Sequence, residues 1–167
     1  MANVKNQNKM KKLVLMAAML GVMVSCKPKQ SLVTTSVNRK TQVALKGDWV
    51  VSGVEYAGSE YFKVTSFEIA DAKCFEGSEW HLVSNNDSGN MTLKKAGCSS
   101  YASDIKWYVT DENQMVLKFI KEGEKPRKVT SGYILIVSNV TENAFDLTSK
   151  VQVGNSGGKV VYHFRKK

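Results

Sequence analysis

Residues 105–120 read IKWYVTDENQMVLKFI, and this stretch decides the fold class. Apolar side chains occupy every second position, with Ile105, Trp107 and Val109 in the first half and Met115, Leu117 and Phe119 in the second. A period of two is typical of a β-strand that buries one face. Asp111, Glu112 and Asn113 separate the two halves and are typical of a turn. The stretch therefore predicts a β-hairpin.

The same pattern continues on both sides of this hairpin. From residue 47 onward, β-branched and aromatic residues form short runs separated by Gly, Asn, Asp and Ser, and proline occurs once, at Pro126. Such runs are typical of strands joined by tight turns. We expect strands over residues 48–56, 61–70, 80–84, 90–95, 105–110, 115–120, 128–138, 144–153 and 159–165. A glycine-containing turn at 154–158 precedes the last strand, and no helical period interrupts the series.

Eight to nine antiparallel strands in succession would leave two exposed sheet edges. Closure into an up-and-down barrel removes both edges. Residues 47–167 are therefore predicted to form an all-β, antiparallel up-and-down β-barrel. A two-sheet sandwich is the alternative that the same spacing of strands allows.

The amino terminus has the features of a cleavable export signal. Four lysines and no acidic residue precede an apolar run over residues 13–24. That run is shorter than the roughly 20 apolar residues of a membrane span. It ends in Met-Val-Ser-Cys at residues 23–26, which resembles the lipobox of bacterial lipoproteins. We expect residues 1–25 to be a signal peptide and Cys26 to carry the lipid anchor. An ordinary secreted protein cut near Ser25 is the alternative.

The number of cysteines agrees with lipidation of Cys26. The chain has three cysteines, and an exported protein seldom keeps an unpaired thiol. If Cys26 is lipidated, Cys74 and Cys98 remain as a pair. A disulfide between them would close a loop of about 25 residues and contribute about 3 kcal/mol in the chain-entropy model. Two buried free thiols are the alternative.

The formal net charge of +9 is concentrated near the amino terminus. The signal holds four of the 24 basic residues and residues 27–46 hold five more, which leaves 15 basic residues against all 15 acidic ones. Residues 47–167 therefore lack the basic footprint of nucleic-acid binding, and nucleic acid is not a predicted partner. Residues 26–46, rich in Ser, Thr and Lys after the lipidated Cys26, are predicted to form a flexible tether.

A Gly-Asp-Trp sequence at residues 47–49 begins the first expected strand and resembles the Gly-x-Trp motif of the lipocalins. In that family the Trp packs across the closed base of the barrel and a basic residue near the chain end lies over its ring. The resemblance thus implies that Gly47, Trp49 and Arg165 form the barrel base, with a cation-π contact.

Several further segments resemble the short lipocalin-like lipoproteins of Bacteroidota. They are CFEGSEW at 74–80, Cys98, IKW at 105–107, GY at 132–133 and VYHF at 161–164. The resemblance covers the whole domain and the signal, and it implies a fold and a location more than an activity. The chain is shorter than most lipocalins and shows no helix after the last strand, which argues against a large ligand cavity.

Two hypotheses for function follow from the inward-facing apolar positions. The residues expected to line the interior and contact a ligand are Phe67, Trp107, Leu117, Phe119, Leu135 and Tyr162. Small barrels of this strand number either fill with side chains or hold one small ligand. The first hypothesis is a membrane-anchored module that binds a small apolar or amphipathic molecule. The alternative is a structural or interaction lipoprotein with a filled barrel that contacts another envelope protein.

The sequence supplies no recognisable catalytic or metal-binding motif. Only His81 and His163 could act as an imidazole base, and neither lies near a nucleophile motif. Glu79 and His81 share strand parity, but no third ligand at suitable spacing completes a metal site. No catalytic residue, metal or cofactor is therefore predicted, and the chain is not expected to be an enzyme.

The residues after Cys26 indicate a location. They lack an acidic cluster of the kind that resembles a surface-export signal in Bacteroidota, and Lys27 replaces the Asp that commonly retains lipoproteins in the inner membrane. We expect a lipid-anchored protein of the bacterial outer membrane that faces the periplasm.

Overall fold

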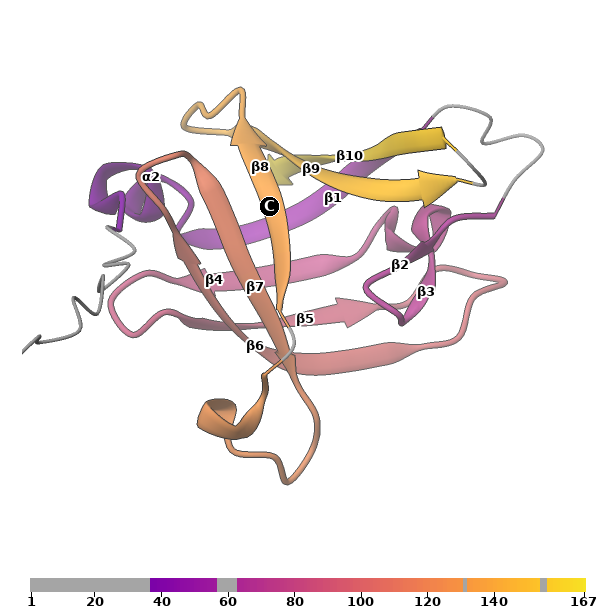
Figure 1. The fold of residues 1–167 in the computed structure, drawn as a ribbon, viewed down its shortest axis with the longest axis horizontal. Helices are drawn as coiled ribbons and strands as arrows, with labels where there is room; N and C mark the ends of the chain where they lie inside the picture. Colours follow the sequence, from indigo (N-terminus) through magenta and orange to yellow (C-terminus); the bar gives the residue numbers. More distant parts are fainter. Residues whose placement is uncertain (1–36, 57–62, 131, 154–155) are drawn as a thin grey trace, which may run out of the picture. The chain divides into compact units, whose positions relative to one another are not determined.

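The computed structural model describes residues 37–56, 63–130, 132–153 and 156–167, and it confirms the all-β prediction. Eight antiparallel strands close into a barrel in the order β1-β10-β9-β8-β7-β6-β5-β4 (Figure 1). Their bounds are β1 Gly47–Tyr56, β4 Glu79–Val83, β5 Ser88–Leu93, β6 Tyr101–Val109, β7 Gln114–Ile120, β8 Tyr133–Ser138, β9 Ala144–Val153 and β10 Ser156–Lys166. Consecutive strands are neighbours, as an up-and-down topology requires.

Strand β1 closes the barrel because it pairs with a strand on each side. Its first four residues pair with β4, where Trp49 lies opposite Trp80, and residues 49–56 pair with β10, where Val54 lies opposite Tyr162. A register shift between Val51 and Gly53 bends β1 between these partners. The closed ring of pairing decides in favour of the barrel and against the sandwich.

The hairpin of residues 105–120 forms as predicted. Trp107 pairs with Leu117, and both side chains are fully buried. At the turn, Asn113 adopts a positive φ of 55° and its N–H donates to the Thr110 carbonyl at 2.9 Å. The alternation of side chains directly sets which face of each strand points into the barrel.

The prediction of a strand at residues 61–70 is wrong. The described part of this segment forms a short hairpin of β2 (Thr65–Ser66) and β3 (Ala70–Asp71), separate from the barrel sheet. Phe67 and Glu68 have φ values of 55° and 56°, and the Ile69 N–H donates to the Ser66 carbonyl at 3.0 Å. The local turn interrupts the strand, although the residue types favour an extended chain.

Two other boundaries also differ from the prediction. The segment 128–138 becomes a strand only at Tyr133, because a short 3-10 helix, η2 (Pro126–Lys128), precedes it. The last strand already begins at Ser156, inside the expected turn, whose residues 154–155 lie outside the described part.

The predicted flexible tether ends earlier than residue 46. Val37 pairs with Thr110, helix α2 spans Arg39–Ala44, and Leu45 is fully buried. The Asn38 side chain caps α2 by accepting from the Thr41 N–H at 3.1 Å. A six-residue helix is too short to produce a detectable period, so the sequence pattern missed it. The described residues from Val37 onward belong to one compact unit, while the signal segment and Cys26 lie outside the described residues.

Candidate functional site

Aromatic side chains fill the base of the barrel. The Trp49 ring is fully buried and meets Phe145 edge-on at 4.7 Å between centroids, and Phe145 stacks on Phe164 at 4.5 Å. The Trp49 indole N–H donates to the Leu45 carbonyl at 2.9 Å, which fastens the segment after α2 across the base. The base is therefore a packed plug rather than an opening.

The cation over Trp49 is Lys166 and not Arg165. The Lys166 Nζ atom lies 5.4 Å from the Trp49 ring centroid. Trp49 lies directly opposite Lys166 in the β1–β10 pairing, whereas Arg165 lies opposite Val50 and points to the other face. Strand parity could have corrected the prediction, because Arg165 cannot share a face with the inward-pointing Tyr162. Gly47 lies beside this contact with a φ of 126°, which favours glycine.

The six predicted ligand-contacting residues divide between the core and one end of the barrel. Trp107, Leu117 and Leu135 are fully buried in the packed interior. Phe67, Phe119 and Tyr162 meet at the end opposite the base, which we call the mouth. The structure thus brings together half of the predicted set.

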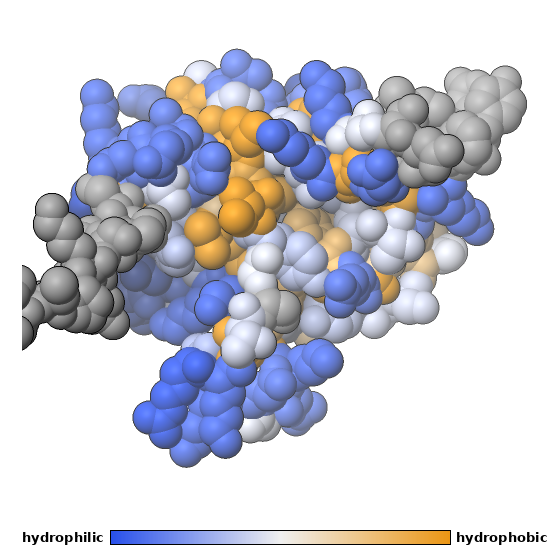
Figure 2. Space-filling view, viewed as in Figure 1, coloured by the Kyte–Doolittle hydropathy of each residue, from blue (hydrophilic) through white to orange (hydrophobic). Residues whose placement is uncertain are grey.

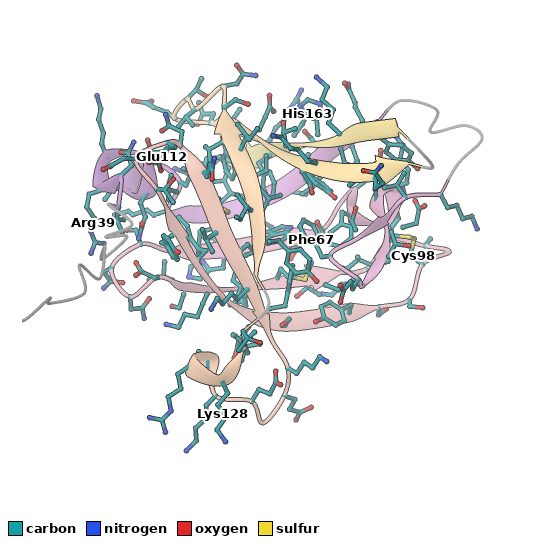
Figure 3. All side chains as sticks on the ribbon, in the orientation of Figure 1. Arg39, Phe67, Cys98, Glu112, Lys128 and His163 are labelled. Carbon is teal, nitrogen blue, oxygen red and sulfur yellow. A yellow bond between two sulfur atoms is a disulfide. The ribbon has the colours of Figure 1, made fainter. Side chains whose placement is uncertain are left out.

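The Phe67 ring is the centre of an aromatic cluster at the mouth. Its centroid lies 5.2 Å from Phe75 and Tyr133, 5.4 Å from Phe119 and 5.5 Å from Tyr162. Phe67 belongs to the β2–β3 turn, and Figure 3 shows its side chain directed from that turn toward the barrel strands. A bulky residue with positive φ is rare, so packing of the ring must offset backbone strain at this turn.

Two tyrosine hydroxyls hold the hairpin in place. Tyr133 donates to the Phe67 carbonyl at 2.7 Å, and Tyr162 donates to the Ser66 hydroxyl at 2.5 Å. Burial raises the pKa of Tyr162 to about 12, although the hydrogen bond with Ser66 acts in the opposite direction. Burial also raises the pKa of Tyr133, with a further contribution from the negative charge of Glu68. Both phenols therefore stay protonated near neutral pH and act as donors.

Two open pockets flank Phe67 at the mouth. One has a volume of about 530 Å³ and includes Lys63, Ser66 and Lys150 in its lining. The other has a volume of about 290 Å³ and includes Tyr101, Phe119 and Lys121. Phe67, Glu68 and Tyr133 line both pockets, so they form the wall between them.

Sequence reasoning missed several residues that line these pockets. They are Lys63, Tyr101, Lys121, Tyr133 and Lys150. Tyr133 shares the inward parity of Leu135 and could have been found from the strand pattern. The three lysines follow no period, and only the folded chain brings them to one rim.

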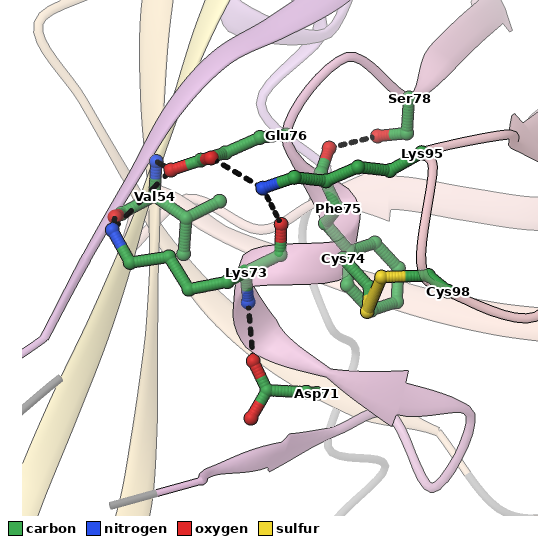
Figure 4. A network of polar contacts seen from close by, with 9 residues as sticks. All are labelled: Val54, Asp71, Lys73, Cys74, Phe75, Glu76, Ser78, Lys95 and Cys98. Atoms are coloured by element: carbon green, nitrogen blue, oxygen red, sulfur yellow. Dashed lines mark hydrogen bonds and ion pairs between the residues drawn. A yellow bond between two sulfur atoms is a disulfide. The ribbon is translucent and has the colours of Figure 1, made fainter. Parts of the chain in front are cut away.

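The rim beside the mouth is held by the predicted disulfide. Cys74 and Cys98 are bonded, with Cα atoms 5.8 Å apart. Figure 4 shows the same rim around Glu76, where one carboxylate oxygen accepts from Lys95 at 2.6 Å and the other contacts Lys73 at 3.3 Å. The Lys95 hydrogen bond is the main reason that the pKa of Glu76 lies below its usual value, and burial opposes the effect.

The two histidines form separate pairs on the outer wall. His81 Nδ1 lies 2.7 Å from Asp48, and His163 Nδ1 lies 2.7 Å from Asp146. Glu79 pairs with Lys167 at 2.9 Å instead of joining His81. Across the described residues, no group of three His, Cys, Asp or Glu side chains is placed to hold a metal ion.

The fold and the mouth together define a class of protein: an all-β chain built on a small, closed, lipocalin-like barrel with a plugged base. Comparison with protein-family models, with curated proteins and with solved structures finds no match to this chain. In the described part of the chain, no helix has the length and apolar character needed to cross a membrane.

Proposed function

We propose that this chain is a lipid-anchored envelope protein whose barrel mouth binds a small amphipathic molecule. Cys26 would carry the anchor, and the barrel would face the periplasm from the outer membrane. The observation that carries the binding proposal is the position of Phe67 as a wall between two open, partly aromatic pockets.

The lining of the pockets favours a ligand with one apolar and one anionic part. Phe67 and Tyr133 offer ring faces for the apolar part. Lys63 and Lys150 on one side, and Lys121 on the other, supply three cations against the single carboxylate of Glu68, which leaves an excess of positive charge for an anionic group. The packed interior limits the ligand to a ring or a short chain at the mouth, because Trp107 and Leu117 already fill the space below.

Native mass spectrometry of the protein purified from its own host tests the binding proposal. We expect a small molecule to be retained. A titration with the apolar dye N-phenylnaphthylamine gives a second measurement. The Phe67→Ala variant removes one of the two ring faces and should bind the dye several-fold more weakly, whereas Val43→Ala, on the exposed side of α2, should bind as the parent does. An empty barrel together with equal dye binding in all three proteins would contradict the proposal.

The anchor has its own test. Mass spectrometry of the amino-terminal peptide should show a lipid on Cys26, and Cys26→Ser should move the protein out of the membrane fraction. Protease treatment of intact cells should leave the barrel uncut if it faces the periplasm. Removal of the domain by external protease would contradict the proposed orientation.

A second candidate function rests on the packed interior. A barrel filled by residues such as Trp49, Trp107 and Met91, each fully buried, is also suited to a structural or interaction role that needs no ligand. The mass-spectrometric experiment separates the two candidates, because only the binding protein should retain a small molecule.

A further inference from the structure

An exposed apolar strip runs along the outer face of β8. Ile134 and Ile136 point outward there and are 62% and 40% exposed. Val116 on β7 lies opposite Ile134, and Tyr108 on β6 lies opposite Val116, so the apolar surface extends over three strands. Figure 2 shows apolar side chains gathered over β7 and β8.

The strip is unusual among the outward positions of this barrel. Outward positions on β4, β5 and β9 carry polar residues such as His81, Asn90 and Lys150. A barrel in water needs such polar outer residues, and isolated exposed apolar ones need no explanation. Contiguous exposed apolar residues on adjacent strands are instead typical of a contact surface.

The apolar exposure continues to the base end of the barrel. Val140, just after β8, is 38% exposed, and Val43 on α2 is 52% exposed. Val140 and Ala44 line a common hollow with two cations, Lys40 and Lys166, and one acidic residue, Glu142. The strip therefore reaches the place where the described chain enters the barrel.

Cations also lie at the other end of the strip. The exposed loop between β7 and β8 holds four basic residues against two acidic ones: Lys121, Lys125, Arg127 and Lys128 against Glu122 and Glu124. Lys128 projects from this loop in Figure 3. Apolar side chains between basic groups are suited to the interface of an anionic bilayer, where lysines meet headgroups and apolar groups enter the acyl boundary.

The position of the proposed anchor favours the same contact. Val37 pairs with Thr110 at the end of β6, next to β7. Ten residues lie between it and Cys26, and such a segment spans at most about 40 Å. A lipid on Cys26 would thus keep the barrel at a high effective concentration near the membrane.

We infer that the outer face of β7 and β8, centred on Ile134 and Ile136, rests on the surface of an anionic bilayer. The inference rests on the proposed anchorage at Cys26. It goes beyond it by stating which side of the barrel touches the lipid.

Chemical coupling of the protein to vesicles tests this inference. Residues 26–167 contain the whole compact unit, and with Cys74 and Cys98 bonded, Cys26 is the remaining thiol. It can be coupled to a maleimide lipid in vesicles of phosphatidylglycerol and phosphatidylethanolamine with brominated acyl chains. Ile134→Trp and Ile136→Trp place a fluorescent reporter on the strip, and Asn90→Trp places one on the outer face of β5 as the matched control.

We expect the brominated lipid to quench the added fluorescence of both strip variants about threefold more than that of Asn90→Trp. The difference should shrink when phosphatidylcholine replaces phosphatidylglycerol. Equal quenching at all three positions would overturn the inference. Absence of quenching at the strip would also overturn it and would indicate that this face binds a protein instead. The vesicle experiment attaches Cys26 to lipid chemically, so its result does not depend on lipidation in the host. If the host protein carries no lipid on Cys26, the proposed anchor is refuted, but the quenching result remains valid.

Discussion

The base and the mouth of the barrel are closed in different ways. At the base, Trp49 packs among Phe145 and Phe164 and is tied to the segment after α2 by one indole hydrogen bond. At the mouth, the two-pair hairpin of β2 and β3 inserts Phe67 through a turn with positive φ, next to open pockets. The base is closed by chain that continues directly into β1, whereas the mouth is covered by a short insertion.

This difference suggests where the molecule can open. Separating the base would expose Leu45, Trp49 and the fully buried Gln42, which bonds to the Ser84 carbonyl at 3.1 Å. Displacing the hairpin breaks two tyrosine hydrogen bonds and relieves the strained turn at Phe67. The mouth is therefore the end at which local opening requires less free energy.

Replacing Trp49 should have the largest effect on stability. Trp49→Ala leaves a large cavity in the base and should lower the free energy of unfolding by about 3 to 5 kcal/mol. Urea denaturation followed by circular dichroism measures this loss. Val43→Ala, on the exposed side of α2, is the control and should change stability by less than about 0.5 kcal/mol. A small loss at Trp49 would show that the base is not the tighter end.

Removing the disulfide should weaken the mouth by a smaller amount. Cys74→Ser with Cys98→Ser should lower the free energy of unfolding by about 2 to 4 kcal/mol, because the unfolded loop is no longer restrained. The β signal in circular dichroism should persist. Hydrogen exchange should rise first around η1 (Ala72–Phe75), beside the mouth. Faster exchange at the base instead would reverse the proposed order of opening.

Neutralising Glu76 should also weaken this rim, by less than removal of the disulfide does. Glu76→Gln should cost about 1 kcal/mol at pH 7, a value reduced for partial solvent exposure. Because the folded pKa of Glu76 lies below the ordinary value of 4.5, its stabilisation is complete above that pH. It disappears as the pH falls through the folded pKa, so parent and variant should converge in acid. Glu122→Gln, in an exposed loop, is the control and should change stability little at any pH.

The smallest expected effect is the difference in stability between two variants of Phe67. Both Phe67→Ala and Phe67→Gly remove the ring, but glycine adopts a φ of 55° without strain. Phe67→Gly should therefore be the more stable variant by about 1 kcal/mol. Equal stability would mean that the turn relaxes once the ring is lost, and thermal or urea denaturation can measure the difference.

Much of the fold was predictable because a strand that buries one face has apolar residues at every second position. The hairpin of residues 105–120, the strand at 144–153 and the inward positions Trp107 and Leu117 follow directly from that pattern. Phe67 was expected to line the interior from a strand, whereas it contacts Tyr162 and Phe119 from a turn. The interruption depends on tyrosines that are distant in the chain, so no local pattern reveals it.

The sequence by itself determined the all-β class and the inward faces of the strands, since periodicity is a local property. It favoured the pairing of Cys74 with Cys98, which the structure confirms. Only the tertiary structure decided that the sheet closes through β1 and that α2 seals the base. It also brought Lys63, Lys121 and Lys150 to one rim. Such contacts join residues far apart in the chain, and closure of the barrel fixes them through register and packing.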